Sequence, residues 1–501
     1  MRRAYTFRRS LEEFAAAREQ FNSLVNRLQS EETAWMEHGE VEALVATEGM
    51  ELLRCLLQGH LDLRAVRESK REAVMGADGV RRSHCRRACE RPLMTLFGEV
   101  RVERQGYSAR GQSSLFPLDG ELNLPLDKYS HGLRQRVAEE VSKNSFDKAV
   151  ATVGQTTGGK IPKRQAETLA AKVTHDFGAF YKTRQARLAE ETQDLLVISL
   201  DSKGIVMLQE DLREATRKAA EQAQPKLKSR LSKGEKRCRK RMATVATVYT
   251  LKAQVRTAEA IMGLEEDDQA RPRARNKRVW ASVERAPEAV TEEVFQEALR
   301  RDPSMQHPWV ILVDGDEHQL ERIIACVKRH HVEVTLVLDL IHVLEYLWKA
   351  VYCFHPEGSE EAEAWVAERA LRILKGQASE VAAGMRRSAT LRELTPDQRK
   401  GVDKCADYLL KYRAMLHYDD YLATGLPIAT GVIEGACRHL IQDRMDLTGA
   451  RWRLQSAEAV LKLRSLQSSG DFDEYLAFHK AQELKRNHAS RYANFSLQEA
   501  A

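Results

Sequence analysis

The strongest constraint on the fold is the order of apolar runs between residues 195 and 338. Short runs rich in β-branched residues predict strands, whereas longer runs with apolar residues every three or four positions predict helices. The order is three strands, a helix, a strand, a helix and a strand, at 195–200, 243–251, 277–283, 291–301, 309–313, 317–330 and 332–338. We expect Thr291 to cap the first of these helices. The pattern predicts an α/β unit built on one sheet.

This order of elements is that of a ribonuclease-H-like core, in which the first and fourth strands are neighbours. Asp201 directly follows the first predicted strand, and Asp314 directly follows the fourth. We therefore expect the two carboxylates to face each other at the centre of the sheet. Glu434 lies in a later helical pattern, which would pack beside them. The helical stretch 346–424 would then be an insertion before the last acidic residue.

Asp201, Asp314 and Glu434 together predict a metal site. Two Mg²⁺ ions about 3.5–4 Å apart can hold a phosphodiester, activate the attacking oxygen and stabilise the leaving oxygen. Magnesium prefers carboxylates and water as ligands, and Mn²⁺ can substitute for it. Taken singly, each acid has an ordinary explanation, because aspartates often end strands in turns and glutamates usually lie on solvated helix faces. Their order and element context favour phosphoryl transfer.

Asp339 and His342 follow the fifth predicted strand and open a helix. Both would point toward the same end of the sheet as the three acids, where His342 could orient a phosphate or transfer a proton. The equally weighted alternative is that Asp339 is a helix N-cap and His342 a buried structural residue. Asp316 is the expected bystander, because Asp314 directly ends the apolar strand.

Basic residues gather beside the predicted metal site, in an insertion at 210–242. Such a patch would neutralise DNA phosphates, although a charge run is more often a solvated helix face. We predict DNA contacts at Lys203, Lys233, Lys236, Arg237, Arg239, Lys240 and Arg241, and further along the chain at Arg438, Arg444 and Arg451. Trp452 could stack on a base. We favour the alternative that it packs in the protein.

Before the predicted core, the chain divides into a helical region at 1–74, which could support oligomerisation, a small β-containing region at 75–128 and a region at 129–190. The last has a helix, a glycine-containing turn and a second helix, the layout of a helix-turn-helix. Lys163, Arg164 and Gln165 would begin the second helix and contact DNA. The alternative is a plain helical hairpin with a basic face. The core itself is predicted at 191–345, and its C-terminal helical part at 425–501.

One glycine-rich stretch imitates a nucleotide-binding loop. Residues 154–160 match the glycine and lysine spacing of a P-loop, but Ile161 and Pro162 stand where a serine or threonine should ligate magnesium. We therefore expect no nucleotide cofactor.

Composition places the protein among globular chains. Hydrophobic residues make up 43% and charged residues 30% of 501 residues, and the net charge is +6. No apolar run reaches bilayer length and no secretory signal is evident, so we expect a cytoplasmic protein without a membrane partner. Eight scattered cysteines fit a reducing compartment. His84, Cys85 and Cys89 lack a second metal-binding pair, so we interpret them as ordinary residues.

Seven stretches resemble the DDE transposases of bacterial insertion sequences, specifically the ISKra type. They are residues 201–207, 212–218, 232–243, 276–283, 312–315, 339–348 and 431–437. The resemblance places the acidic triad on Asp201, Asp314 and Glu434. It implies Mg²⁺-dependent cleavage and strand transfer, binding of double-stranded DNA at terminal inverted repeats and target sites, a homo-oligomer of at least two chains, and association with the nucleoid.

The chain departs from that family in two places. Ser202 stands where relatives often have glycine, and no Cys-x-x-Cys pair follows Tyr107, so we predict no zinc ribbon. Two other functions remain open: a ribonuclease-H-like, structure-selective DNA nuclease that cuts without joining, and a catalytically inactive domesticated transposase that acts as a DNA-binding protein.

Overall fold

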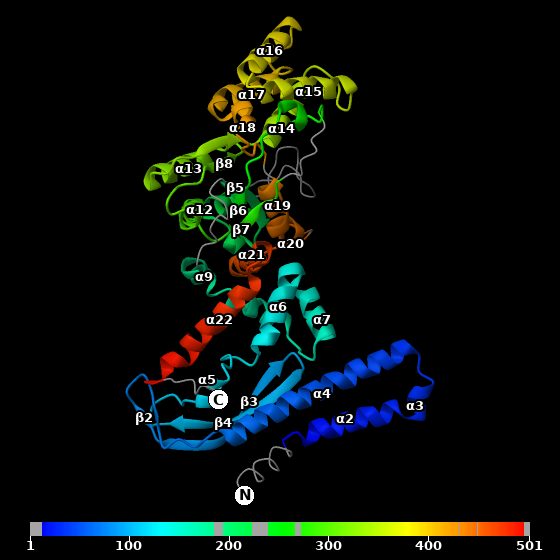
Figure 1. The fold of residues 1–501 in the computed structure, drawn as a ribbon, viewed down its shortest axis with the longest axis vertical. Helices are drawn as coiled ribbons and strands as arrows, with labels where there is room; N and C mark the ends of the chain where they lie inside the picture. The colour runs from blue at the N-terminus through cyan, green and yellow to red at the C-terminus, as the bar shows by residue number, and fades with distance from the viewer. Residues whose placement is uncertain are drawn as a thin grey trace. The chain divides into compact units, whose positions relative to one another are not determined.

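The computed structural model describes residues 13–184, 194–222, 239–265, 272–429, 431–447 and 449–494. The chain forms two compact units (Figure 1). We call residues 1–183 with 471–501 the terminal unit, because it holds both chain ends, and residues 184–470 the sheet unit.

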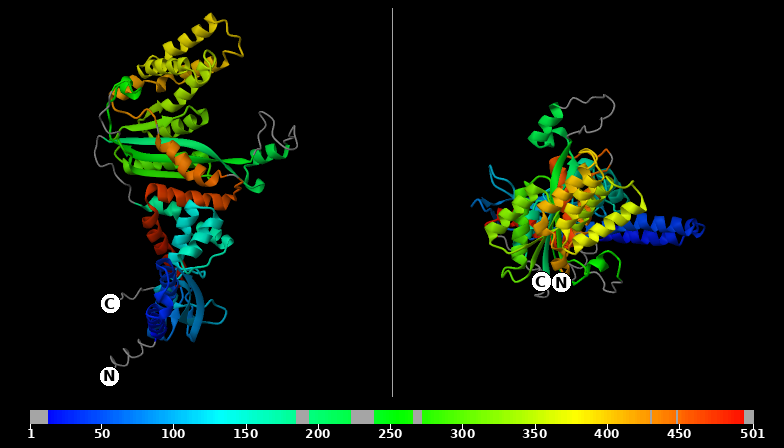
Figure 2. Two further views of the ribbon diagram at one scale, coloured as in Figure 1. Left: turned by 90° about the vertical axis from the view of Figure 1, so that its right-hand side faces the viewer. Right: turned by 90° about the horizontal axis from the view of Figure 1, so that it is seen from above.

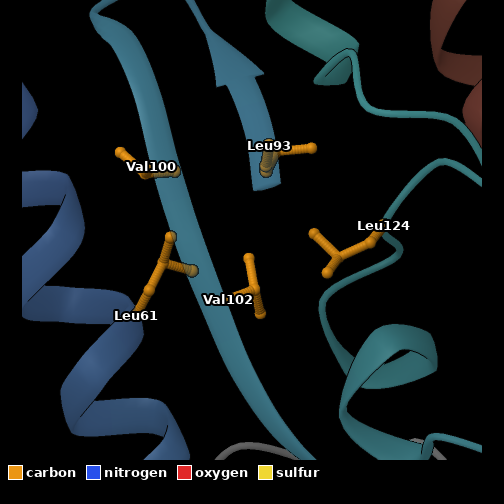
Figure 3. Packing of buried hydrophobic residues seen from close by; sticks show 5 residues of the cluster. All are labelled: Leu61, Leu93, Val100, Val102 and Leu124. Carbon is orange, nitrogen blue, oxygen red and sulfur yellow. The ribbon is translucent and has the colours of Figure 1, made fainter. Parts of the chain in front are cut away.

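A β-hairpin forms the centre of the terminal unit. Strands β3 (His84–Thr95) and β4 (Gly98–Ser108) pair antiparallel, and the two-residue β1 (Val74–Met75) and β2 (Arg81–Arg82) pair separately. Alternate residues of β4 are buried, as expected for a strand with one apolar face. Together with neighbouring segments they form the cluster drawn in Figure 3, which comprises Leu61, Leu93, Val100, Val102 and Leu124.

The helices expected near the start of the chain are α2 (Ala15–Leu28), the short α3 (Glu31–Ala34) and the long α4 (His38–Arg67). Helix α4 begins with a capping box, in which Glu37 and Glu40 each satisfy the other's backbone N–H. Helix α2 lies along α4 in Figure 1 and in the right-hand view of Figure 2.

Six further α-helices and a short 3-10 helix complete the described part of the terminal unit. They are α5 (Pro117–Glu121), α6 (His131–Lys143), α7 (Phe146–Thr156), α8 (Lys163–Val173), α9 (Phe177–Thr183), α22 (Phe472–Asn487) and η4 (Ala489–Arg491). Ser130 and Ser145 cap α6 and α7 through their side chains. The chain therefore returns to this unit through α22 after completing the sheet unit.

Two glycines of the stretch that imitates a P-loop, Gly158 and Gly159, serve packing in this structure. A Cβ on Gly158 would lie 2.4 Å from the Phe97 carbonyl carbon, and one on Gly159 would lie 2.7 Å from a Leu133 methyl group. The Gly158 N–H donates to the Leu96 carbonyl at 2.7 Å. Only glycine permits this approach of the α7–α8 turn to the hairpin.

The sheet unit contains a five-stranded mixed sheet in the order β7-β6-β5-β8-β9. The strands are β5 (Leu195–Val206), β6 (Lys240–Leu251), β7 (Arg275–Ser282), β8 (Trp309–Val313) and β9 (Thr335–Leu338). β6 pairs antiparallel with both β5 and β7, whereas β8 runs parallel to β5 and to β9. All five predicted strands are present, and the first and fourth are neighbours as expected.

Helices cover both faces of this sheet. Figure 1 places α12 (Pro287–Arg301) and α13 (Glu317–His330) on one side and α19 (Gly431–Cys437) on the other. Helix α21 (Leu454–Ser469) lies along the free edge of β7, where the Val279 N–H donates to Oγ of Ser469 at 2.9 Å. The prediction that Thr291 caps α12 is wrong, because the helix begins four residues earlier, with Pro287 in its first turn. Proline is well suited to that position, since its missing N–H would have no helical partner there.

The stretch between β9 and α19 is helical, as predicted. It contains α14 (Leu340–Val351), α15 (Glu360–Leu374), α16 (Ala378–Leu391), α17 (Lys400–Lys411), η2 (Arg413–Met415) and α18 (Tyr418–Ala423). The shorter elements elsewhere in the unit are η1 (Gln209–Asp211), α10 (Glu214–Gln222), α11 (Ala258–Ile261), the π-helical η3 (Arg438–Gln442) and α20 (Asp443–Met445). Throughout the described part of the chain, every helix is too short or too polar to cross a lipid bilayer.

Candidate metal and DNA-processing site

Three aspartates lie in one row across the parallel part of the sheet. Ser199 of β5 pairs with Leu312 of β8, and Val313 of β8 pairs with Leu338 of β9. Continuing each parallel register by one or two residues aligns Asp201 with Asp314, and Asp314 with Asp339. The Asp339 N–H donates to the Val313 carbonyl at 2.8 Å, which extends the β8–β9 register to this point. The two predicted ligands therefore occupy corresponding positions on neighbouring strands, and Asp339 occupies the next one along the sheet.

Asp201 differs from the prediction in one respect, because β5 does not end there. The strand continues to Val206 and stays paired with β6, where Asp201 lies opposite Val245. Its parallel pairing with β8, however, ends at Ser199. Asp201 consequently lies inside a strand but beyond the end of its neighbour, which leaves one side of its backbone facing the loop after β8.

Tyrosines of the helical insertion hold the loop that carries Asp314. The Tyr408 hydroxyl donates to the Asp314 carbonyl at 2.8 Å, and the Tyr412 hydroxyl donates to the Gly315 carbonyl at 2.6 Å. Gly315 has a φ of 89°, and a Cβ there would lie 2.9 Å from the Tyr412 ring. A glycine is thus required for both the backbone conformation and the close tyrosines. Asp316 caps α13 by accepting from the Gln319 N–H at 2.7 Å, which fits its expected bystander role.

Asp339 is the N-cap of α14, which is one of the two roles that its sequence position left open. One carboxylate oxygen caps α14 by accepting from the Ile341 N–H at 2.8 Å, while the other lies 3.9 Å from Nδ1 of His342. The residue is 3% exposed. The Tyr418 hydroxyl fixes the backbone just before it by donating to the Leu338 carbonyl at 2.7 Å.

Glu434 lies on α19, far along the chain from the three aspartates, and contacts Asp339. Burial raises the pKa of its carboxyl group, and the adjacent Asp339 raises that pKa further through its charge and a shared hydrogen bond, whereas the charge of His342 opposes the shift. Oε1 of Glu434 is buried and has no hydrogen-bond partner among the described residues. Glu434 and Asp339 are thus two acids in contact, and one oxygen of Glu434 lacks a partner. A cation bound there would stabilise both carboxylates.

In the described part of the chain, two side chains contact the Asp201 carboxylate. The Cys437 thiol donates to Oδ2 of Asp201 at 3.1 Å, and Nζ of Lys203 lies 3.1 Å from the same oxygen. Burial lowers the pKa of Lys203, but the Asp201 carboxylate outweighs this effect, so that the lysine pKa is raised overall. Burial, together with Asp201, raises the pKa of Cys437, so its thiol stays protonated. Lys203, predicted to contact DNA, therefore lies against a predicted metal ligand.

These residues fit a divalent cation by charge and donor type, since carboxylate oxygens are what Mg²⁺ prefers. Ligand atoms of Asp201, Asp314 and Glu434 do not converge within 4.8 Å of one another in the described part of the structure. A site for two ions about 3.5–4 Å apart does not require this, because its outer ligands bind different ions. The described residues that do converge so closely are His417, Asp419 and Asp420, which are all exposed. Exposed acids are common without a metal, and no buried donor accompanies them.

The basic insertion is described only in part. Lys233, Lys236 and Arg237 lie outside the described residues. Arg239 is exposed, and Nζ of Lys240 lies 3.4 Å from Asp446. Arg241 instead donates to the carbonyls of three residues, Asp211, Val283 and Glu284. Arg241 thus links segments of the protein, whereas Arg239 and Lys240 are exposed at the surface.

The predicted DNA-contacting arginines after Glu434 also divide into exposed and buried residues. Arg438 lies 3.6 Å from Asp443, and Arg451 is exposed. Arg444 is 4% exposed, and its guanidinium lies 4.7 Å from the centre of the Trp452 ring. The Trp452 indole N–H donates to the Met445 carbonyl, so the tryptophan packs as favoured from the sequence. Arg444 supports that packing, and its burial argues against a phosphate contact.

The second helix of the predicted helix-turn-helix begins where expected. Helix α8 starts at Lys163, and Lys163, Arg164 and Gln165 are all exposed. Nζ of Lys163 lies 2.6 Å from Asp147 in the first turn of α7, which ties the two helix starts together. Arg164 and Gln165 are therefore the better candidates for contacts with a ligand of this surface.

Sequence reasoning did not identify Tyr408, Tyr412, Tyr418 and Cys437 as neighbours of the site. The tyrosines contact backbone carbonyls from helices far along the chain, so no local motif signals them. Cys437 carried a signal, because it lies three residues after Glu434 and therefore near the same helix face. No protein-family model matches the chain, and a search of curated proteins gives no match either.

Proposed function

We propose that the protein is a DDE-type transposase with a ribonuclease-H-like core, which cleaves DNA and joins the freed strand to a target. The observation that carries this proposal is the row of Asp201, Asp314 and Asp339 across neighbouring parallel strands, with Glu434 in contact with the last. The strand order β7-β6-β5-β8-β9, with one antiparallel strand beside the centre, supports the core. The resemblance of the sequence motifs supports joining in addition to cutting.

In this proposal, Asp201, Asp314 and Glu434 hold the metal, with Asp339 as a supporting acid. Bound Mg²⁺ would supply the Lewis acidity that activates water or a 3′ hydroxyl and stabilises the leaving oxygen. Tyr408 and Tyr412 position Asp314 through its backbone. His342, whose Nδ1 is buried without a hydrogen-bond partner in the described residues, would orient the scissile phosphate.

The proposed substrate is double-stranded DNA, both at terminal inverted repeats and at a target. Arg164 and Gln165 on α8, and Arg239, Lys240, Arg438 and Arg451 in the sheet unit, are exposed candidates for phosphate contacts. Handling two element ends requires at least two chains, so we propose a homo-oligomer. A cytoplasmic location follows from the same proposal, because the substrate lies there.

A strand-transfer assay with pre-cleaved inverted-repeat ends tests the activity. We expect Mg²⁺- or Mn²⁺-dependent joining by the wild type and its loss in Asp201→Asn, which keeps the size of the side chain but weakens metal binding. Asp316→Asn is the matched control, because Asp316 is an exposed helix cap near the row. Cleavage without joining would favour the nuclease, DNA binding without either reaction would favour the inactive binder, and joining by Asp201→Asn would overturn the metal assignment.

A further inference from the structure

One face of the long helix α4 is apolar and exposed. Its stripe, which we call the outer stripe, consists of Val45, Gly49, Leu53, Leu56 and His60. Spacings of three and four residues place all five on one side of a helix. Val45, Leu53 and Leu56 are 41%, 43% and 41% exposed, and a Cβ on Gly49 would meet nothing within 4 Å.

The other two faces of α4 are already occupied within the terminal unit. On one, Leu61 joins the core against β4, and Gln58 donates to the Arg101 carbonyl at 2.9 Å. On the other, Glu48 accepts from Gln20 of α2 at 2.6 Å, and a Cβ on Gly59 would lie 2.9 Å from the Phe14 ring. The outer stripe is thus a third face, separate from the contacts that build the fold.

The outer stripe is self-complementary when a second copy of α4 lies antiparallel to it. In one register about the middle of the helix, Leu53 faces Leu56 of the copy, and Gly49 faces His60. The leucines then pack against each other, and the large His60 meets the small Gly49, as in knobs-into-holes packing. The same register brings Glu42, near the start of the helix, opposite Arg67 at its end. Both residues are exposed.

The distribution of charge favours the antiparallel arrangement over a parallel one. Glu40, Glu42, Glu48 and Glu51 lie in the first half of α4, whereas Arg54, Arg64 and Arg67 lie in the second half, with Asp62 as the one acid there. Parallel copies would place like charges side by side, while antiparallel copies place acids opposite bases. A twofold axis through the middle of the helix relates the two copies, so that each copy makes the same contacts.

We propose that the outer stripe of α4 is a homodimer interface, in which two copies of the chain pair their α4 helices antiparallel with Leu53 packed against Leu56. This deepens the proposed function by assigning its oligomer to a surface, although the interface itself requires neither DNA nor catalysis.

Sedimentation analysis of the full chain, under reducing conditions and without DNA or Mg²⁺, tests the interface separately from the activity. We expect a dimer whose dissociation constant rises at least about 30-fold in the double variant Leu53→Glu/Leu56→Glu, because burial of two leucines per copy is lost. Leu391→Glu is the control, since Leu391 is a 74% exposed leucine on α16. A wild type that stays monomeric at micromolar concentrations overturns the proposal and leaves the stripe to another partner, and an unchanged dimer in the double variant also overturns it.

A charge exchange tests the direction of pairing. Glu42→Arg and Arg67→Glu should each weaken the dimer about fivefold, because each places like charges together. The combined variant Glu42→Arg/Arg67→Glu should restore the wild-type dissociation constant, since opposite charges would again face each other at both ends of the paired helices. Additive weakening in the combined variant would contradict the antiparallel register.

Discussion

The two units each bury a cluster of acids, and their partners differ. In the terminal unit, Asp176 accepts from Nδ1 of His479 at 2.7 Å and pairs with Arg486 at 3.0 Å. Glu483 pairs with Arg134 at 2.9 Å. In the sheet unit, the hydrogen-bond partner of Glu434 is another acid, Asp339.

The pKa shifts of the two clusters have opposite signs. Burial would raise the pKa of Asp176, but Arg486 and His479 lower it overall. Burial and Asp339 both raise the pKa of Glu434, with His342 as the opposing neighbour. A buried acid whose charge is matched by arginine holds the fold together, whereas one that faces another acid leaves a charge for a ligand to neutralise. Arginine pairing is therefore typical of a structural cluster, whereas the contact between Glu434 and Asp339 is typical of a ligand-binding one.

The largest expected effect is on the chemistry of the sheet unit. Asp314→Asn should lower the rate of Mg²⁺-dependent strand transfer by at least about 10³-fold, because several kcal/mol of metal-based stabilisation is lost. Rates with pre-cleaved DNA ends measure this. The thermal unfolding of the variant should stay close to that of the wild type, and a rate within tenfold of wild type would remove Asp314 from the site.

The terminal unit should respond in the opposite way, with a loss of stability. Arg134→Ala should lower the free energy of unfolding by about 3–5 kcal/mol, because it removes the arginine that pairs with the buried Glu483 and with the partly buried Asp127. Denaturant unfolding checks this. Arg136→Ala, two residues along the same helix, removes a half-exposed pair with Glu139 and should cost less than about 1 kcal/mol. Equal losses in both variants would contradict a structural role for the buried network.

Metal should stabilise the sheet unit through the uncompensated acids. When Mg²⁺ is at about ten times its dissociation constant, the unfolding free energy should rise by about 1.4 kcal/mol. Thermal unfolding with and without Mg²⁺ measures the shift. It should vanish in Glu434→Gln and persist in Asp419→Asn/Asp420→Asn, which removes the exposed acids near His417. The reverse pattern would move the metal to the exposed cluster.

Acidification should separate the clusters further. Burial lowers the pKa of His131 to about 4, against the opposing charge of Glu483 and with Arg134 and Lys480 adding to the shift. The unfolded chain then binds more protons below pH 6.5, so stability falls as the pH drops from 7 to 5, by an amount on the order of 1 kcal/mol. His131→Gln should reduce this loss in unfolding experiments across that range. Since the pKa of Glu434 is raised, its protonation should instead relieve repulsion as the pH falls.

The smallest effect concerns the thiol beside Asp201. Cys437→Ala should slow strand transfer about two- to fivefold, because Asp201 loses one hydrogen-bond donor. Cys437→Ser keeps a donor and should stay near the wild-type rate. Comparing the two variants in the same assay separates hydrogen bonding from packing, and equal slowing in both would assign the effect to packing.

Much of the sheet unit was predictable because its signals are local. Strand β8 and helix α13 have the predicted bounds, since a continuous apolar run and an aspartate cap specify them. The end of β5 was not predictable, because residues 201–206 become strand by pairing with β6 rather than through their own apolar character. Helix α12 begins earlier than expected because Pro287 starts the helix, so that Thr291 lies inside it and does not cap it.

By itself, the sequence determined which residue types were available to a site: two aspartates after apolar strands, a third before a helix, and a distant glutamate. Only the tertiary structure decided which of them meet. Strand register aligned Asp201, Asp314 and Asp339, and the packing of α19 brought Glu434 against Asp339. The physical reason is range: strand and helix signals act over a few residues, whereas the charge and desolvation of a buried acid depend on groups that are far apart in the chain and close in space.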